Sequence, residues 1–334
     1  MIDRLDNNSK QYLLSLPLVA GIGHGLKETG GIQTNNEAII VLVKKKIPPD
    51  RLAKHQLVPA SICGMLTDVI EVGELVAHAR GMSDAPDGVL EPGDHGQPET
   101  GQPENAAVDT LEIMQSRTAR VRPAPPGVSI GHYRVTAGTF GAVVYDNSTG
   151  IPIILSNNHV LANATNGRDL RARLNDPVLQ PGSIDGGRQN RNIIARLARF
   201  IPLAESPGLN LVDCAAAQPL QNELVVPEIL GIGKVQGVTA PSLGMNVKKS
   251  GRTTGLTYGQ VRAVNVIANV SYGRNRVLRF EKQILTTRIS SPGDSGSLVL
   301  DEQNRAVGLL FAGSDTSTIL NPIQTVLDLL KARF

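Results

Sequence analysis

The chain has 334 residues, of which 41% are hydrophobic, 19% are charged and only 3% are aromatic. This length and apolar content can bury a sizeable core over two or three domains, which excludes a wholly disordered protein. The net charge is +3, with the densest basic cluster in "VKKKIPPDR" at 43–51. With few aromatic platforms and no longer basic run, a nucleic-acid partner is not expected.

Residues 1–83 are predicted to form a small α/β accessory domain. A short helix around residues 12–14 leads into three strand-like segments rich in Val and Ile, "LVAGIGHGLK", "EAIIVLVKKK" and "VIEVGELVAHA". The stretch "DRLAKHQLV" at 50–58 predicts a helix between the last two strands.

The N-terminus and the cysteines indicate a compartment. No basic region leads into a long apolar run, and the other apolar runs are strand-length, so neither a secretory signal nor a membrane span is expected. Cys63 and Cys214 lie far apart in the sequence and are expected to be reduced thiols. We therefore expect a cytoplasmic protein without membrane association.

The segment 84–127 differs from its surroundings. Its first part, within "SDAPDGVLEPGDHGQPETGQPENAA", is dense in Pro, Gly and acids and has few large apolar side chains. Such a stretch cannot bury enough surface to offset the cost of ordering, so a mobile linker is predicted. Its exposure predicts nicking within 84–126, and "VDTLEIMQSR" could supply one or two turns of helix.

From about residue 128 the pattern indicates an all-β half. Short Val-, Ile- and Leu-rich segments recur between Gly, Pro, Asn and Ser, which suits one or two small barrels or a sandwich. The chain closes with "NPIQTVLDLLKARF", where Asn321 is the predicted N-cap and Pro322 the first helical residue. Apolar residues on one face predict an amphipathic C-terminal helix.

A Gly-Asp-Ser-Gly turn lies in "ISSPGDSGSLVL" at 289–300. Ser295 is either a nucleophile or part of a tight hairpin, and a serine hydroxyl needs a base, most often histidine, to become a nucleophile. All six histidines precede Ser295, and position 297 is Ser rather than Gly. An α/β-hydrolase, which requires the order Ser, acid, His and a G-x-S-x-G elbow, is therefore excluded.

Two upstream residues are the best candidate partners of Ser295. His159 ends the apolar segment in "IILSNNHVLA", and Asp213 is embedded in the apolar run "LNLVDCAAA". A carboxylate is costly there unless a group such as an imidazole N–H donates to it. Taken singly, each could instead be a structural histidine or a turn-capping aspartate, and His132 remains a second candidate base.

The turn itself could stabilise an oxyanion. Gly293 can adopt a positive φ, which lets its N–H and that of Ser295 point to one side. Asp294 between them would serve the turn rather than the reaction. This set of residues requires neither a metal nor a cofactor.

Together, an all-β half with His159, Asp213 and Ser295 in that order resembles the chymotrypsin-like (trypsin-fold) serine proteases. "SNNHV" is similar to the histidine segment of their bacterial members, "NLVDCAAA" to the aspartate strand and "SPGDSGSLVL" to the serine loop. "KKSGRTTGLTYGQV" resembles the strand–turn–strand before that loop. The resemblance covers roughly residues 130–334.

The resemblance implies a mainly β fold, a double antiparallel β-barrel with six strands in each barrel and a C-terminal helix. The first barrel would span 128–225 and carry the histidine and the aspartate, and the second would span 226–334 and carry the serine loop. Ser295 would attack a peptide carbonyl, His159 would transfer the proton and Asp213 would orient His159. The implied function is a serine endopeptidase that forms an acyl-enzyme from protein or peptide substrates.

The implied specificity pocket is framed by the residues before the serine and by a later strand. It consists of Ile289, Ser290, Ser291, Pro292, Phe311, Ala312 and Gly313. No acid occurs among these residues, so a small or medium apolar side chain is expected rather than Arg or Lys.

Other functions remain open. Residues 1–83 resemble a unit found on uncharacterised trypsin-like proteins of bacteria and plants, which leaves room for homo-oligomer formation through this unit. The alternative function is a non-catalytic or latent protein of this fold that acts as a protein-binding or assembly module. An esterase or acyl transferase would use the same catalytic atoms.

Overall fold

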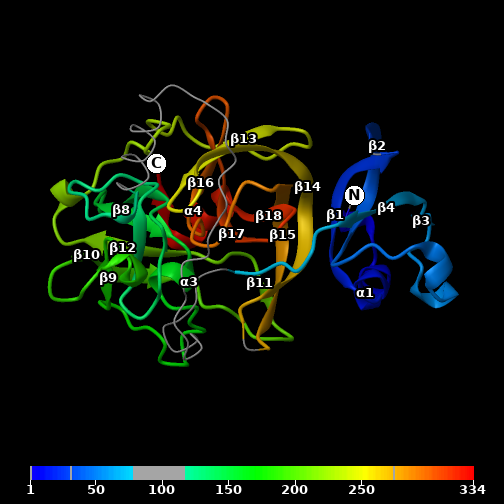
Figure 1. Ribbon diagram of the computed structural model, residues 1–334, viewed down its shortest axis with the longest axis horizontal. Helices are drawn as coiled ribbons and strands as arrows, with labels where there is room; N and C mark the ends of the chain where they lie inside the picture. Colours follow the sequence, from blue (N-terminus) through cyan, green and yellow to red (C-terminus); the bar gives the residue numbers. More distant parts are fainter. Residues whose placement is uncertain (1, 31, 78–116, 274) are drawn as a thin grey trace, which may run out of the picture.

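The computed structural model describes residues 2–30, 32–77, 117–273 and 275–334 (Figure 1). Its architecture is mainly β, as predicted, with two curled sheets and a C-terminal helix. The predicted linker lies outside the described residues from position 84 to 116, and so does most of the helix considered in "VDTLEIMQSR".

Within the described residues, the first sheet has eight strands. Their bounds are β5 Ser129–His132, β6 Gly138–Thr139, β7 Ala142–Asp146, β8 Pro152–Ser156, β9 Pro177–Leu179, β10 Ile193–Phe200, β12 Ala215–Pro219 and β19 Ala332–Arg333. Their order in the sheet is β19-β7-β8-β12-β10-β9-β5-β6. All but β19 come from the segment predicted to form the first barrel.

The second sheet has eleven strands in the described part of the chain. Their bounds are β1 Val19–Thr29, β2 Ile32–Val43, β3 Ser61–Ile62, β4 Met65–Glu71, β11 Leu209–Asn210, β13 Asn246–Gly251, β14 Gly255–Ser271, β15 Val277–Thr287, β16 Leu298–Asp301, β17 Ala306–Gly313 and β18 Ser317–Pro322. Their order is β11-β15-β18-β17-β16-β13-β14-β1-β2-β4-β3, and β14 also pairs with β15. That additional pairing closes β13 to β18 into a six-stranded barrel, and the "KKSGRTTGLTYGQV" hairpin is confirmed as β13 and β14.

Several clusters of buried apolar residues hold the two sheets together. One packs against the first sheet around Phe140 and Ile154, and another lies in the second barrel around Val261 and Leu320. A further cluster joins strands of both sheets to the C-terminal helix α4 (Ile323–Leu330). The helix buries Ile323, Val326, Leu327 and Leu330, which confirms the predicted apolar face.

The predicted cap of that helix is wrong. The N-cap residue is Pro322, with no side-chain cap, while Asn321 belongs to β18. The Asn321 side chain is fully buried and bonds the backbone of Asp213 instead. Its amide is therefore used for tertiary structure rather than for the helix end.

The N-terminal unit combines helix α1 (Asn7–Ser15) with β1 to β4. The Asp6 side chain caps α1 by accepting a 2.7 Å bond from the Ser9 backbone N–H. The helix predicted at 50–58 is wrong, because the chain forms two short 3-10 turns there, Pro49–Arg51 and Lys54–Gln56. Extended backbone at Ala53, between the turns, prevents a continuous helix.

The N-terminal unit is joined to the second barrel by a continuous sheet. Strand β1 pairs with β2 on one side and with β14 on the other, with Gly21 opposite Ala268. A Cβ at Gly21 would lie only 2.4 Å from the Ile267 carbonyl oxygen, so glycine is what lets the two strands approach. An ion pair between Arg262 and Glu28, with a separation of 2.7 Å, crosses the same junction.

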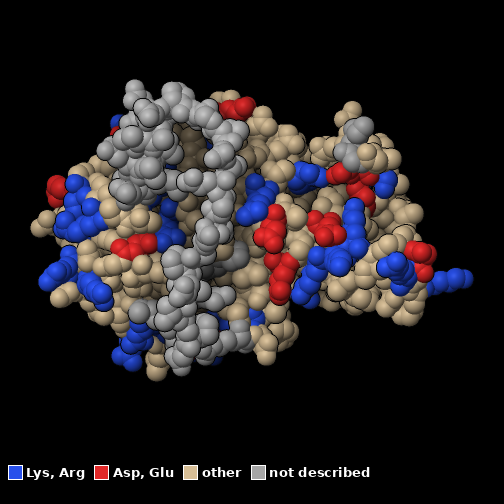
Figure 2. All heavy atoms as spheres, in the orientation of Figure 1, with Lys and Arg blue, Asp and Glu red and all other residues tan. Residues whose placement is uncertain are grey.

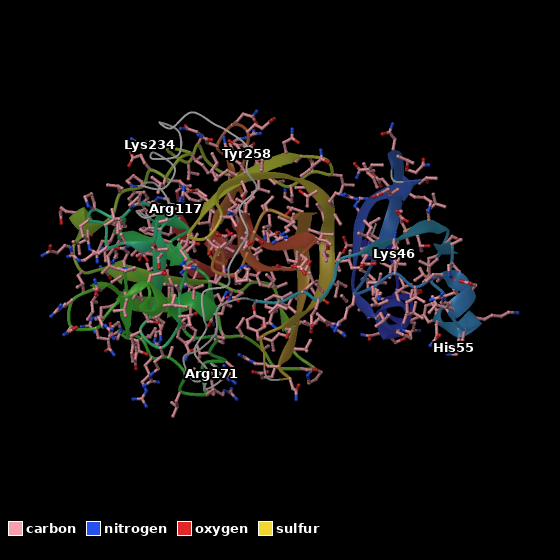
Figure 3. The ribbon with its side chains drawn as sticks, in the orientation of Figure 1. Lys46, His55, Arg117, Arg171, Lys234 and Tyr258 are labelled. Atoms are coloured by element: carbon pink, nitrogen blue, oxygen red, sulfur yellow. The ribbon has the colours of Figure 1, made fainter. Side chains whose placement is uncertain are left out.

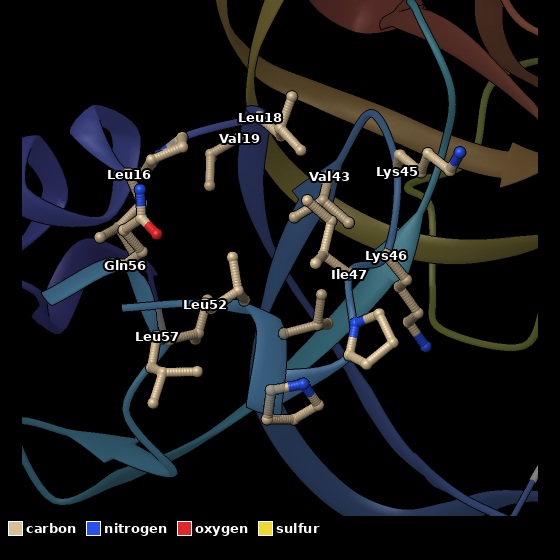
Figure 4. A pocket seen from close by; sticks show the side chains of 15 residues that line it. Leu16, Leu18, Val19, Val43, Lys45, Lys46, Ile47, Leu52, Gln56 and Leu57 are labelled. Carbon is tan, nitrogen blue, oxygen red and sulfur yellow. The ribbon is translucent and has the colours of Figure 1, made fainter. Parts of the chain in front are cut away.

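An apolar cavity of about 460 Å³ opens in the N-terminal unit between α1, β2 and the 3-10 turns (Figure 4). Its lining includes Leu16, Leu18, Val43, Ile47, Leu52 and Leu57, with Lys45 and Lys46 also present. On the face shown in Figure 2, acidic and basic side chains are interspersed rather than gathered by sign.

The structure also bears on the membrane and the thiols. In the part of the chain that the structure describes, no helix has both the length and the apolar character needed to cross a bilayer. Cys63 is an exposed free thiol and Cys214 a buried one.

Candidate active site

His159 lies on α3 (Asn158–Leu161), a single buried turn that follows β8. Its Nδ1 atom is 2.5 Å from Asp213 Oδ2, and its backbone N–H donates to Asp213 Oδ1 at 3.2 Å. Both side chains are buried, with exposed fractions of 1% and 0%. The structure therefore brings together the histidine and the aspartate that the sequence singles out.

The Asp213 backbone is held by two asparagines. Its N–H donates to Asn321 Oδ1 at 3.0 Å, and its carbonyl accepts from Asn321 Nδ2 at 3.1 Å and from Asn157 Nδ2 at 2.8 Å. Neither asparagine is assigned to the site by the sequence alone. Their position inside apolar runs, "IILSNNH" and "TILNP", was the available signal, because a buried amide needs partners.

Tyr272 is a further member of the site that the sequence did not reveal. Its hydroxyl donates a 2.6 Å hydrogen bond to Asp213 Oδ2, and its ring lies edge-on to the His159 ring with centroids 5.9 Å apart. Tyr272 directly follows β14, 59 positions from Asp213, so only the fold brings the two together.

These contacts set the charge of the carboxylate. Burial by itself raises the pKa of Asp213, but attraction to His159 and hydrogen bonds from His159 and Tyr272 outweigh it and lower the pKa below its ordinary value. Burial, with the adjacent Asp213 charge, raises the pKa of Tyr272 well above its ordinary value. Asp213 is therefore an anion whose carboxylate accepts three hydrogen bonds, two from His159 and one from Tyr272, and Tyr272 is a protonated donor.

Ser295 lies beside the histidine turn. Its carbonyl accepts from the Thr139 N–H at 2.7 Å, and a Cβ at Gly138 would contact both Val160 and the Ser295 carbonyl. The Ser295 Oγ is 3.4 Å from the Phe311 carbonyl oxygen. His159 Nε2 is buried and has no hydrogen-bond partner among the described residues. The serine hydroxyl is thus aimed at Phe311 while the histidine nitrogen that could receive its proton is unpartnered.

The serine loop carries two backbone N–H groups that make no hydrogen bond within the described residues. Gly293 has a φ of +100°, which favours glycine, and its carbonyl is held by Thr139 Oγ1 at 2.9 Å. Within the described residues, neither the Gly293 N–H nor the Ser295 N–H donates a hydrogen bond. Both donors are therefore available to a ligand.

A buried ion pair between Lys249 and Asp294 supports the serine loop. Lys249 Nζ lies 3.3 Å from Asp294 Oδ2, and both side chains are fully buried. Asp294 also accepts from Thr254 Oγ1 at 2.6 Å and from the Thr253 N–H at 2.9 Å. Burial lowers the pKa of Lys249, although attraction to Asp294 opposes this effect. Asp294 therefore serves the turn.

A second buried cation, Arg117, which is labelled in Figure 3, lies near the end of β13, the strand that carries Lys249. Its Nη1 atom donates to Ser250 Oγ at 2.9 Å and to the carbonyls of Gly251 and Gly127 at 3.1 Å. Burial lowers its pKa. These bonds tie the end of β13 to the segment that enters the first barrel.

The residues expected to frame a specificity pocket have different surroundings. Ile289 packs in the core of the second barrel, and Phe311 packs against Phe280 with ring centroids 4.7 Å apart. Ser290 Oγ lies 2.8 Å from Thr318 Oγ1, and a Cβ at Gly313 would lie 3.0 Å from Ser290 Oγ. Ser291 donates its N–H to Asp294, Pro292 is exposed, and Ala312 is buried beside Phe311. The polar groups beside Gly313 are therefore the Ser290 and Thr318 hydroxyls and the Ser317 carbonyl, all of them uncharged.

The second candidate base has a different partner. His132 is fully buried, and its Nε2 lies 3.1 Å from Asp176 Oδ2 in the first barrel. Burial lowers the pKa of His132, while Asp176 opposes the shift. His24 in the N-terminal unit lies 3.2 Å from Glu37.

The two curled sheets and the closing helix have a chymotrypsin-like arrangement. Similar solved structures are serine proteases. Protease A of Thermobifida fusca is 19% identical, with a TM-score of 0.46 over 63% of this chain and 98% of that chain. The Nocardiopsis protease is 18% identical, with a TM-score of 0.47 over 63% and 98%. The active form of the Rv3671c protease from M. tuberculosis is 15% identical, with a TM-score of 0.36 over 73% and 95%. No protein-family model and no curated protein matches the chain.

Proposed function

We propose that this chain is a serine endopeptidase with Ser295 as nucleophile, His159 as general base and acid, and Asp213 as the carboxylate that orients the histidine. The observation that carries the proposal is the buried pair of Asp213 and His159, in which Oδ2 and Nδ1 are 2.5 Å apart. The other ring nitrogen of His159, Nε2, has no partner within the described residues, and the turn that carries it lies beside the serine loop. A buried carboxylate fixes the imidazole tautomer and stabilises the imidazolium, which is what a nucleophilic serine requires.

The reaction uses only side chains and backbone amides. Ser295 Oγ adds to the substrate carbonyl carbon as its proton passes to His159 Nε2, and the N–H groups of Gly293 and Ser295 receive the oxyanion. The C–N bond then breaks, and His159 returns the proton to the leaving amine. Water then adds to the resulting ester as His159 takes its proton, the ester C–O bond breaks, and His159 returns the proton to Ser295 Oγ as the carboxylic acid leaves.

One observation favours a latent form of this enzyme. The Ser295 hydroxyl lies near the Phe311 carbonyl rather than His159, and Ser295 is only 2% exposed. Reaction therefore requires rotation of the serine side chain and access for a substrate. A protein with this site permanently closed would act as a binding module, which is the competing function.

Active-site labelling tests the proposal. A fluorophosphonate probe should label purified protein at one residue, and Ser295→Ala should abolish labelling and peptide hydrolysis. Losses for each member of the triad should be about 10⁴- to 10⁶-fold in turnover, and they should not add. His132→Asn is a matched control, because His132 is also buried and also paired with a carboxylate. Labelling that survives in Ser295→Ala would refute the assignment, and a folded protein that never reacts would favour the binding module.

A further inference from the structure

The chain inserts a short segment of its own between two strands of the second barrel. After β4, residues 72–77 leave the N-terminal unit and run towards the barrels (Figure 1). The Val76 N–H donates to the Gly313 carbonyl at 3.0 Å, and the Gly313 N–H donates back to the Val76 carbonyl at 3.1 Å. On the other side, Ala77 N–H donates to the Ser271 carbonyl and Ser271 N–H to the Leu75 carbonyl, both at 2.9 Å.

The side chains of this segment alternate between buried and half-exposed. Leu75 and Ala77 are buried in the cluster that contains Phe280, Phe311 and Ala312. Val76, between them, is half-buried. Paired backbone bonds to a strand edge, with alternate side chains in pockets, are how an extended peptide is recognised by a sheet.

The segment is also directed at the nucleophile. It is antiparallel to β17, with Val76 opposite Gly313, so its C-terminal end runs towards Phe311. The Phe311 carbonyl is the group that lies 3.4 Å from Ser295 Oγ. On the other flank, Ser271 is followed by Tyr272, which bonds Asp213. The two strands that flank the segment thus lead to Phe311 and Tyr272, the residues that contact Ser295 and Asp213.

The segment is paired over fewer residues than a strand of the barrel. Its pairing consists of isolated bridges at Val76 and makes it part of neither sheet. It is preceded by Gly73, at a φ of +69°, and by the exposed residue Glu74. These features suit a bound peptide that the chain supplies itself.

We propose that residues 75–77 occupy the peptide-binding strand of this site in cis, as a substrate-like segment. The site accordingly takes extended peptides whose side chains before the reacting bond follow the order of Leu75, Val76 and Ala77. The first side chain is large and aliphatic, the second is unrestricted and the third is small. The cleavage of such peptides rests on the proposed function, whereas their binding does not. Because the segment is tethered, its effective concentration reaches the millimolar range, and a peptide in trans must compete with it.

Peptide binding to the full-length Ser295→Ala chain tests this without catalysis. The probe is a fluorescent acetyl-Leu-Val-Ala peptide, followed by anisotropy. Val76→Pro removes the N–H that bonds Gly313 and should displace the segment, so the probe should bind about tenfold more tightly than to the parent. Leu75→Asn removes the buried anchor but keeps the backbone bonds, and it should act in the same direction. Glu74→Ala, at the exposed neighbour, should bind like the parent.

The outcomes separate the two proposals. Equal binding to the parent and to both displaced variants, with each variant folded by its thermal melt, would overturn the inference whether or not the protein is an enzyme. If the probe binds more tightly to both variants but no chain that contains Ser295 is labelled by the fluorophosphonate, the inference about the bound segment stands and the peptidase proposal is refuted. With Ser295 intact, hydrolysis of an acetyl-Leu-Val-Ala-His amide should rise about tenfold in Val76→Pro.

Discussion

Tyr272 and His159 bond the same oxygen of Asp213, with the tyrosine hydroxyl at 2.6 Å and His159 Nδ1 at 2.5 Å. The tyrosine follows the long strand β14 of the second barrel, whereas the histidine lies on α3, which follows β8 of the first sheet. This carboxylate therefore ties the two halves together at the site, and its partners should affect both reactivity and stability.

Tyr272→Phe tests this arrangement. Loss of a hydrogen bond to a charged group should cost about 1.5–3 kcal/mol of unfolding free energy in urea titrations. Because Tyr272 helps to hold the Asp213 pKa low, that pKa should rise in the variant. The stability from ionised Asp213 is present above the unfolded-state pKa and lost as pH falls through the folded-state pKa, so it should now be lost at higher pH.

Labelling by the fluorophosphonate should slow about tenfold in Tyr272→Phe, equivalent to roughly 1.4 kcal/mol. Tyr258→Phe, which removes an exposed hydroxyl (Figure 3), should leave labelling and stability unchanged. Equal behaviour of the two variants would show that Tyr272 does not support the carboxylate.

Lys249→Met should leave the buried Asp294 carboxylate, which supports the serine loop, without its counterion. Removing one member of a buried ion pair costs about 3–5 kcal/mol, because the other charge remains buried without its counterion. The loop that carries Gly293 and Ser295 should lose its order, so labelling should fall more than unfolding alone explains. Lys248→Met, at the neighbouring half-buried lysine, is the control. The double variant Lys249→Met/Asp294→Asn should recover part of the stability, and a double variant weaker than the single would contradict this prediction.

His132 should make the protein sensitive to mild acid. Burial lowers its pKa from 6.5, so as pH falls below 6.5 the unfolded chain binds a proton before the folded chain does. Unfolding free energy should therefore fall with pH from about 6.5 down to the folded-state pKa. In urea titrations between pH 7.5 and 5, His132→Gln should show a shallower decline than the parent. If the unfolding free energy of the parent and of His132→Gln declines equally with pH, His132 does not cause the acid sensitivity.

Gly21→Ala should weaken the junction between the N-terminal unit and the second barrel. Its Cβ would lie 2.4 Å from the Ile267 carbonyl, which requires the strands to separate at a cost of about 1–3 kcal/mol. Gly131→Ala, where the nearest heavy atom is at 3.6 Å, is the matched control. If both variants unfold at the same urea concentration, the close approach of β1 and β14 does not matter for stability.

Processing of the chain is open to a direct test. The sequence predicts nicking at 84–126, and the part of that range before 117 lies outside the described residues. The bound segment instead predicts a serine-dependent cut within the first few residues after Ala77. Intact-mass measurements on incubated wild type and Ser295→Ala should show that product in wild type alone. Identical products from both chains would exclude self-cleavage.

Much of the all-β half, from residue 128 onward, could be predicted from local sequence. His159, Asp213 and Ser295 each occupy a local setting that suits one role in a triad, and their order along the chain favours a nucleophilic serine over a structural turn. Helix α4 likewise has a clear apolar stripe. The helix at 50–58 fails because its apolar residues line a cavity around two short turns. Asn321 fails as a cap because its amide is needed by a buried backbone 108 positions away.

The sequence by itself determined the order of the reactive residues, the glycine that permits the serine loop and the periodicity of strands and helix. These are properties of single residues and near neighbours, and short-range sterics and hydrophobic burial set them. The tertiary structure alone decided that Tyr272, Lys249 and Asn321 support the site and that Leu75 and Ala77 lie beside it. Such contacts join segments tens to hundreds of positions apart, and their energies depend on which groups burial brings within hydrogen-bonding distance.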